Sequence, residues 1–297
     1  MTRPAFGNEE QRAVNTERII REAVVRHPLL AALPVKVYAK GSYRNNTNVR
    51  RDSDVDVAVE YTGINFPTYA ESADPAHIDG ALGLTPYDGP LTDATGSTNM
   101  SLLKNAVGEA LTGAFGSSTV TRHNKVFTVR ESSRSLAADV IPCASHVHYW
   151  SATSSATGIR LLPDRPTWHR IDNYPQQHYT NGVAKNDETH RRFKRVVRIL
   201  KTLENRMVED GASPPVPGYL VECLVYGAPG RCFSGYTWAS RVREVLAHIW
   251  TDTESAECAS RWLEVNGVKL LFHPAQKWTR HSARDFVHAA WQYVEES

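Results

Sequence analysis

Residues 40–61 read KGSYRNNTNVRRDSDVDVAVEY, which places two aspartates at the head of an alternating run of valines. Successive side chains of a β-strand point to opposite faces, so the valines face a core while Asp54 and Asp56 face the other side. Two residues of strand rise separate the aspartates by about 7 Å at Cβ. Carboxylates at this spacing repel each other, and a divalent cation, which prefers oxygen ligands, would relieve the repulsion.

A Gly-Ser pair, Gly41 and Ser42, lies twelve positions upstream of Asp54. Glycine permits a close backbone approach, successive N–H groups can form an anion-binding nest, and the serine hydroxyl adds a donor. Asp139, in SLAADVIPC, lies in an expected strand, where a charge is costly unless it is paired or binds a metal. The pattern predicts a phosphate cradle beside a two-metal site, although each residue alone is also typical of a polar strand end or a salt bridge.

The rest of the chain divides into an α+β N-terminal half and a helical C-terminal half. In the first half, the hydrophobic pattern predicts helices over 8–27 and 101–115 and strands over 34–40, 54–60, 119–130 and 135–143. Two stretches rich in turn-forming or small polar residues, 62–99 and 151–158, are interpreted as a surface excursion and a loop. Beyond residue 170, helices are expected over 187–209, 217–226, 237–251, 256–265 and 283–295.

The helix expected over 187–209 has a face that suits an anion. Its apolar residues lie on one side, and the opposite side carries the cations Arg191, Lys194, Arg195, Arg198 and Lys201. No acidic residue within 191–203 can pair with them along the helix. A triphosphate with its metal ions is the expected counter-charge, and a solvated basic face is the ordinary alternative.

Composition limits the class of protein. The chain has 297 residues, 41% of them hydrophobic, which is enough for a large core. No apolar run approaches the roughly 18 residues of a membrane span, and the N-terminus lacks the apolar stretch of a signal peptide. The four cysteines form no C-x-x-C pair, and a net charge of +2 argues against bulk binding to nucleic acid. We therefore expect a soluble cytoplasmic protein with no membrane contact and no stable nucleic-acid complex.

The motifs resemble a known family. Gly41-Ser42, Asp54-x-Asp56 and Asp139 are similar to the site of the polymerase β-type nucleotidyltransferase superfamily. The blocks RHNKVFTV, ADVIPC, NYPQQHYTNGVAKN, FKRVVRILKTLEN and GYLVECLVYGAP resemble the bacterial cGAS/DncV-like nucleotidyltransferases (CD-NTases), of the CdnE-like clade. With the opening motif, these blocks span residues 40–229. One departure is Gly218, where members of the family often carry serine.

The resemblance implies a bilobed α+β protein. A polymerase β-like nucleotidyltransferase core, a mixed sheet with flanking helices, is expected over residues 1–170, and a helical nucleotide-binding domain over 171–297. The implied activity is synthesis of a cyclic di- or trinucleotide from UTP, ATP or GTP with release of pyrophosphate. The product would signal phage infection to a downstream effector in CBASS defence, and the enzyme is expected to be a monomer.

The resemblance also implies the roles of individual residues. Two Mg²⁺ ions, with Mn²⁺ able to substitute, would be held by the catalytic residues Asp54, Asp56 and Asp139. The substrate-binding residues would be Gly41, Ser42, Asn173, Lys185 and Lys201.

Asn173 is the residue implied to choose the base. Its amide can pair with the O4 and N3–H edge of uracil, which favours a uridine-containing product. The alternative is that Asn173 caps a turn before Pro175, a common role for asparagine.

Two other classes of function are consistent with the sequence. A nucleotidyltransferase that modifies an antibiotic, a protein or tRNA would share the three aspartates but need a different acceptor. A non-catalytic sensor of nucleic acid would bind with steep salt dependence and without turnover.

Overall fold

The computed structural model describes residues 7–49, 54–85, 87, 89–91, 99–133, 135–165 and 170–296. The chain forms two compact units. We call Phe6–Tyr43 with Asp54–Pro175 the sheet unit, and Arg44–Ser53 with Gln176–Ser297 the helical unit. Within the described residues, no helix is long and apolar enough to cross a membrane.

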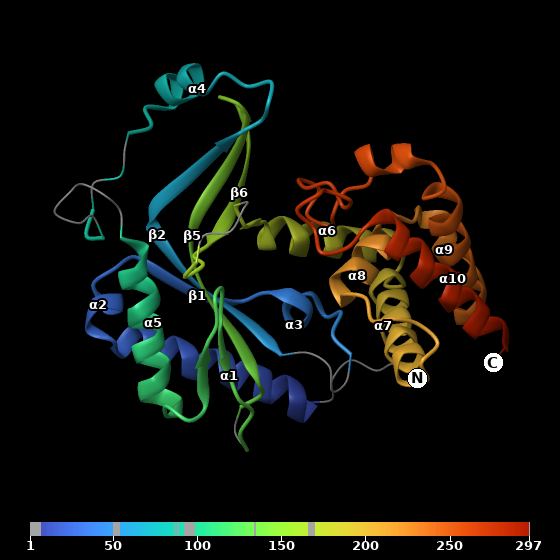
Figure 1. The fold of residues 1–297 in the computed structure, drawn as a ribbon, viewed down its shortest axis with the longest axis horizontal. Coiled ribbons are helices and arrows are strands. Elements are labelled where there is room, and N and C mark those ends of the chain that lie inside the picture. The colour runs from blue at the N-terminus through green and yellow to red at the C-terminus, as the bar shows by residue number, and fades with distance from the viewer. Residues whose placement is uncertain are drawn as a thin grey trace. The chain divides into compact units, whose positions relative to one another are not determined.

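The sheet unit contains one mixed sheet, which has seven strands among the described residues. Its central strands β2 (Val55–Tyr69) and β5 (Ala138–Ser151) are parallel neighbours (Figure 1). The order is β1-β2-β5-β4-β3, with β6 on β5 and β7 on β6. The other strands are β1 (Val35–Ala39), β3 (Val120–Arg122), β4 (Phe127–Val129), β6 (Ser154–Leu161) and β7 (Asp172–Asn173). The helices are α1 (Gly7–Arg26), α2 (Pro28–Ala31), α3 (Gly41–Asn45, continuing into the helical unit), α4 (Pro75–Leu82) and α5 (Met100–Phe115).

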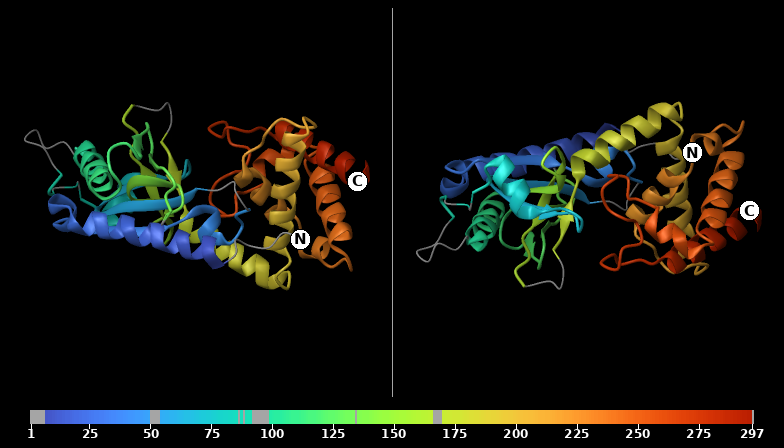
Figure 2. Two further views of the ribbon diagram at one scale, coloured as in Figure 1. Left: turned by 90° about the horizontal axis from the view of Figure 1, so that it is seen from below. Right: turned by 90° about the horizontal axis from the view of Figure 1, so that it is seen from above.

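The valine alternation of β2 fixes which face of the sheet is covered. Val55, Val57 and Val59 are fully buried in a core shared with Ile20 of α1 and Leu103 of α5. Figure 2 shows α1 lying along one face of the sheet. The side chains between the valines therefore face away from this core, as the strand period predicts.

The strand β2 is longer than predicted, because part of the expected surface excursion continues it to Tyr69. Beyond a bulge after Tyr61, β2 pairs with β5 again from Asn65 onward. The pairing with β1 ends at Tyr61, so Pro67 lies where β2 has only β5 beside it among the described residues. A proline is tolerated there, since the missing N–H faces the unpaired side of the strand.

Two more predictions in the sheet unit are wrong. The segment 151–158, interpreted as a loop, instead ends β5 and forms most of β6, because backbone pairing with β5 outweighs its small polar composition. Gly158 is required there: a Cβ would lie 2.6 Å from the Asn173 carbonyl oxygen of β7. The single strand expected over 119–130 is a hairpin of β3 and β4.

The helical unit packs around α7 (Phe193–Glu209), whose apolar stripe is buried as predicted. The expected helix 187–209 is in fact two, because His190 and Arg191 have positive φ values of 51° and 62° that interrupt it. The segment 256–265, expected to be a helix, is a short 3₁₀ turn, Ala256–Ser260. The other helices of this unit are α6 (Pro175–Glu188), α8 (Gly218–Gly227), the 3₁₀ turn Gly230–Phe233, α9 (Trp238–Asp252) and α10 (Arg280–Glu296).

Candidate active site

The three predicted aspartates meet on neighbouring strands of the sheet unit. Asp56 of β2 and Asp139 of β5 are direct partners in the parallel register, and Asp54 immediately precedes β2. On the other side of β5, the Thr128 hydroxyl donates a hydrogen bond to Asp139 Oδ1 at 2.9 Å. The chain therefore gathers three carboxylates on the sheet face opposite the main core, with one of them oriented by a hydroxyl.

The electrostatics of this site oppose full ionisation. Burial raises the pKa of the Asp56 carboxyl; the Lys40 ammonium, 3.9 Å away, lowers it, and Asp139 and Asp54 raise it further. Burial also raises the pKa of Asp54, helped by Asp139 and Glu131. A bound cation would remove this conflict, because it lets all three carboxylates ionise together.

The donor set suits Mg²⁺ in its chemistry, since hard cations prefer carboxylate oxygens. Among the described residues, however, no group of three or more His, Cys, Asp or Glu side chains is placed so that it could hold an ion as it stands. Closing the aspartates on a metal therefore requires their side chains to rotate.

The backbone of Gly41 lies close against Asp56, which is the close approach that the sequence motif predicted for this glycine. Its φ is 68°, and a Cβ at this position would lie 2.0 Å from Asp56 Oδ2. The adjacent Lys40 N–H donates to the Asp56 carbonyl oxygen at 2.8 Å. The half-buried Ser42 makes no side-chain hydrogen bond to any described residue, so its hydroxyl is available to a ligand.

We expect Gly41→Ala to abolish the nucleotidyl transfer that the sequence resemblance implies, and to lower the stability of the sheet unit. The left-handed conformation alone costs about 1–2 kcal/mol with a Cβ, and the added methyl group also displaces the Asp56 carboxylate. Product yield and thermal unfolding measure the two effects. Gly113→Ala in α5 is the matched control, because its Cβ would meet nothing within 4 Å, and it should keep full activity. Full activity in Gly41→Ala would show that this packing against Asp56 is not needed.

Asn173 lies in the short edge strand β7, opposite Ile159 of β6. Contacts hold both of its neighbours in the chain. Arg160 donates two hydrogen bonds to Asp172, at 2.7 and 2.9 Å. The Tyr174 hydroxyl lies 3.1 Å from Nε2 of the buried His146. The side-chain amide of Asn173 bonds to no described residue, and so does not make the capping hydrogen bond of the turn interpretation.

Lys185 and Lys201 belong to the helical unit. Lys185 of α6 lies 3.8 Å from Glu188 and 5.9 Å from the ring centre of Tyr226. The basic face of α7 is less open than its pattern predicts, because Lys201 and its neighbour Arg198 are buried. Lys201 already has a counter-charge, since its Nζ lies 3.3 Å from Glu222 Oε2 of α8.

Sequence reasoning missed Lys40, Thr128 and Glu222. Lys40 contacts Asp56 and Thr128 contacts Asp139, but neither residue belongs to a motif that the sequence analysis recognised. Glu222 did have a signal: it is the single charge in the apolar helix GYLVECLVYG, and a buried charge requires a partner.

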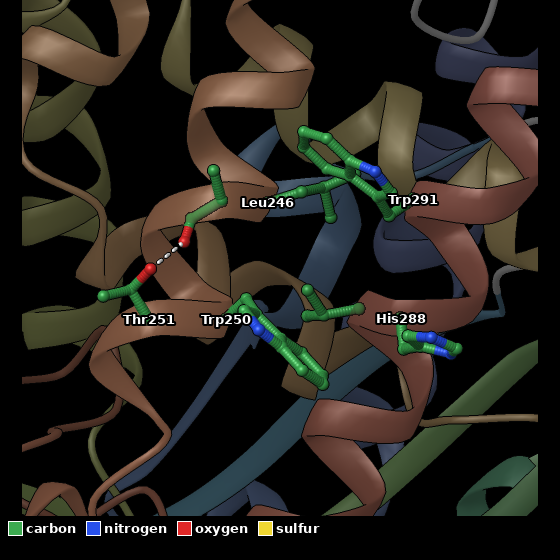
Figure 3. A pocket seen from close by; sticks show the side chains of 7 residues that line it. Leu246, Trp250, Thr251, His288 and Trp291 are labelled. Carbon is green, nitrogen blue, oxygen red and sulfur yellow. Dashed lines mark hydrogen bonds between the residues drawn. The ribbon is translucent and has the colours of Figure 1, made fainter.

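The helical unit also contains a pocket of about 350 Å³ between α9 and α10 (Figure 3). Two tryptophans, Trp250 and Trp291, line it together with Leu246, Ala247, Thr251, Val287 and His288. This lining includes no predicted site residue and no carboxylate, lysine or arginine. The pocket is therefore unsuited to a triphosphate and its metals, and the candidate site remains at the aspartates.

Comparison with known proteins identifies the family of the chain. Residues 180–295 match the family described as the cGAS/DncV-like nucleotidyltransferase C-terminal helical domain. The cyclic dipyrimidine nucleotide synthase CdnE of Cecembia lonarensis is 33% identical over 298 residues, covering 99% of this chain and 96% of that protein. The chain belongs to the CD-NTases.

Other comparisons extend the same result. A cyclic dipurine nucleotide synthase of Elizabethkingia meningoseptica is 34% identical over 263 residues, covering 88% of this CD-NTase and 85% of that protein. The solved structure of Rhodothermus marinus CdnE c-UMP-AMP synthase with Apcpp and Upnpp has a TM-score of 0.78 at 28% identity, covering 99% and 97% of the two chains. The family, the CdnE-like clade, the α+β nucleotidyltransferase fold and the enzyme class predicted from the sequence are confirmed.

Proposed function

We propose that this CD-NTase joins nucleoside triphosphates into a cyclic di- or trinucleotide that contains uridine. The observation that carries the proposal is the set of three aspartates on adjoining strands, with Gly41 packed against Asp56. A glycine turn suited to phosphate, next to carboxylates suited to divalent cations, supports the proposal, because nucleotidyl transfer needs this pairing.

In the proposed mechanism, Asp54, Asp56 and Asp139 would hold two Mg²⁺ ions, or Mn²⁺ in their place. Bound metal lowers the pKa of an attacking ribose hydroxyl and offsets the charge of the phosphates. Ser42 and the Gly41 backbone bind the donor triphosphate and hold its α-phosphorus in line with that hydroxyl. A ribose oxygen–phosphorus bond forms, the bond to pyrophosphate breaks, and the hydroxyl proton passes to solvent. A second such transfer within the linear intermediate closes the ring.

Overall similarity does not select the base, because a dipyrimidine and a dipurine synthase are 33% and 34% identical to this chain. Asn173 is the proposed determinant, since its unbonded amide offers one donor and one acceptor to a uracil edge. We expect Asn173→Ser to lower the preference for UMP over purine incorporation by roughly 1–3 kcal/mol, the usual penalty for an unpaired polar group.

The measurement is base incorporation at equal concentrations of the four NTPs, in wild type and variant. Total nucleotide incorporated and the melting temperature serve as controls for general damage. A wild-type product containing only purines, or an incorporation ratio that does not move, would make Asn173 irrelevant to base choice.

Lys201 is the proposed triphosphate contact of the helical unit. Lys201→Met keeps the aliphatic stem and removes the charge. It should raise the KM for NTPs by roughly 10- to 100-fold, equivalent to about 1.5–3 kcal/mol for a charged hydrogen bond, with kcat changed by less than about threefold. Steady-state kinetics provide the test. An equal fall in kcat and kcat/KM would instead assign Lys201 to stabilisation of the transition state.

Incubation with the four labelled NTPs and Mg²⁺ or Mn²⁺, followed by phosphatase treatment and mass spectrometry, tests the proposed function. A phosphatase-resistant cyclic product supports it. No product with NTPs alone, but transfer to an added antibiotic, protein or tRNA, would favour the other acceptor classes. Binding of nucleic acid without any turnover would favour a sensor.

The proposed setting is CBASS anti-phage defence. The enzyme would act as a monomer in the cytoplasm, where its NTP substrates are present, and its product would bind a downstream effector.

A further inference from the structure

A buried carboxylate, Glu222 of α8, connects three separate segments of the helical unit. Its Oε2 atom accepts a hydrogen bond from the Thr47 hydroxyl at 2.7 Å and lies 3.3 Å from Lys201 Nζ. Its Oε1 atom lies 2.8 Å from His178 Nε2. We call these four residues the Glu222 cluster, which links α6, α7 and α8 to the segment 44–49.

The cluster keeps a charge inside the protein. The side chains of Glu222 and Lys201 are only 3% and 9% exposed. Burial raises the pKa of the Glu222 carboxyl, but Lys201, His178 and Thr47 together outweigh burial and hold that pKa at about 2. Glu222 is therefore ionised at neutral pH, and an ionised buried carboxylate holds its donors tightly, since losing one leaves a charge uncompensated.

The ion pair fixes Lys201 without using all its donors. An ammonium has three N–H groups, and among the described residues the Lys201 ammonium donates a hydrogen bond only to Glu222. Gly218, at the start of α8, faces this side chain: a Cβ there would lie 3.4 Å from Lys201 Cε and 3.8 Å from Nζ, so the absence of a side chain leaves that space beside the ammonium open. Lys201 is thus held in place while it retains donors for a phosphate oxygen.

The same cluster anchors the chain that follows the Gly-Ser pair. Thr47, bonded to Glu222, is fully buried. Asn45 lies 3.1 Å from His178, and the Arg198 guanidinium donates to the Asn46 carbonyl oxygen. The helix α3, which begins with the Gly-Ser pair, ends at Asn45 and therefore ends at these contacts.

We propose that Glu222 is a positioning residue for the donor triphosphate: it fixes the Lys201 ammonium and anchors the segment that follows Gly41-Ser42. The inference rests on the proposed function, because it assigns the phosphate-binding role to Lys201. Glu222 itself would touch neither the nucleotide nor the reacting atoms, so its effect must pass through the residues that it holds.

A double-mutant cycle separates this role from a general structural one. Glu222→Gln should raise the KM for NTPs about tenfold with kcat changed by less than about threefold. The double variant Glu222→Gln/Lys201→Met should bind NTPs at most severalfold worse than Lys201→Met alone, because without Lys201 only the anchoring of the segment 44–49 is left for Glu222→Gln to weaken. Multiplicative single-variant effects would overturn the proposal.

A direct binding measurement gives a readout besides turnover. The Kd of non-hydrolysable α,β-methylene ATP should rise in Glu222→Gln, whereas the Kd of adenosine, which has no phosphates, should not change. Glu264→Gln is the matched control, since Glu264 is also buried and lies 3.6 Å from a lysine, Lys269, that has no assigned phosphate role. Equal increases in the Kd of α,β-methylene ATP for the two variants would overturn the proposal.

Should Glu222→Gln fail to fold, Thr47→Val removes one hydrogen bond of the cluster and keeps the ion pair. It should raise the KM for NTPs severalfold at constant kcat, and an unchanged KM would overturn the proposal.

The outcomes also separate the proposed function from the proposed role of Glu222. If wild type makes no cyclic product, but the binding of α,β-methylene ATP shows the predicted coupling between Glu222 and Lys201, only the proposed function is refuted. Normal synthesis without coupling refutes only the role of Glu222.

Discussion

The double variant Asp54→Asn/Asp56→Asn is expected to make no cyclic product and yet to unfold at a higher temperature than wild type in metal-free buffer at neutral pH. Product should fall by roughly 10³-fold or more, because several kcal/mol of metal-derived transition-state stabilisation is lost. The stability gain follows from the raised pKa values of both carboxyls, which mean that the fold disfavours their ionised forms.

The sign of the pH dependence follows from the same shifts. A carboxyl whose pKa is raised on folding stabilises the protein below its ordinary value, 3.8, and loses that contribution as pH rises through the folded value. The advantage of the Asn variant should therefore be absent in acid and grow toward neutral pH. Thermal unfolding in EDTA across this range measures it.

Two controls sharpen the experiment. Adding Mg²⁺ should stabilise wild type and leave the double variant unchanged, because only wild type has both carboxylates that we propose as ligands of the ion. Glu71→Gln, at an exposed turn, should shift neither stability nor activity. Continued synthesis by the double variant would refute the two-metal proposal, whereas a lower metal-free melting temperature would refute only the argument from repulsion.

The centre of the candidate site could be predicted from sequence because its information is local. The period of a strand assigns Asp54 and Asp56 to one face, and the positive φ of Gly41 is what a motif glycine suggests. The direct pairing of Asp56 with Asp139 was not predicted, because the composition of two strands does not fix the register in which they pair.

What the sequence pattern missed depends on distant partners. The extension of β2 past Tyr61 requires β5 beside it, and no composition rule predicts a strand through Pro67. Likewise, the cationic face of α7 predicts an open anion site, but in the structure Glu222 of α8 forms an ion pair with Lys201 of that face. In both cases tertiary contacts override the local pattern.

The second large effect is expected at Glu222, with the opposite sign. Glu222→Gln should destabilise the helical unit by about 3–5 kcal/mol at neutral pH, the usual cost of leaving one member of a buried ion pair without its partner. Because the pKa of Glu222 is lowered to about 2 from its ordinary 4.5, the carboxylate stabilises the fold above pH 4.5 and loses this contribution as pH falls toward 2. Urea unfolding should therefore show a difference between wild type and variant that shrinks in acid.

Removing the second charge tests whether this ion pair serves stability or positioning. Glu222→Gln/Lys201→Met leaves no buried charge in the pair, so it should recover much of the stability lost in Glu222→Gln, since replacing both partners of a buried ion pair is often nearly neutral. It should not recover NTP affinity, because the ammonium is gone. Recovery of both would show that the pair only stabilises the fold, and recovery of neither would locate the loss in the hydrogen bonds of Thr47 and His178. The pH dependence of unfolding thus distinguishes the two kinds of carboxylate. Ionised Glu222 stabilises the fold, because its pKa is lowered, whereas ionised Asp54 and Asp56 destabilise it, because their pKa values are raised.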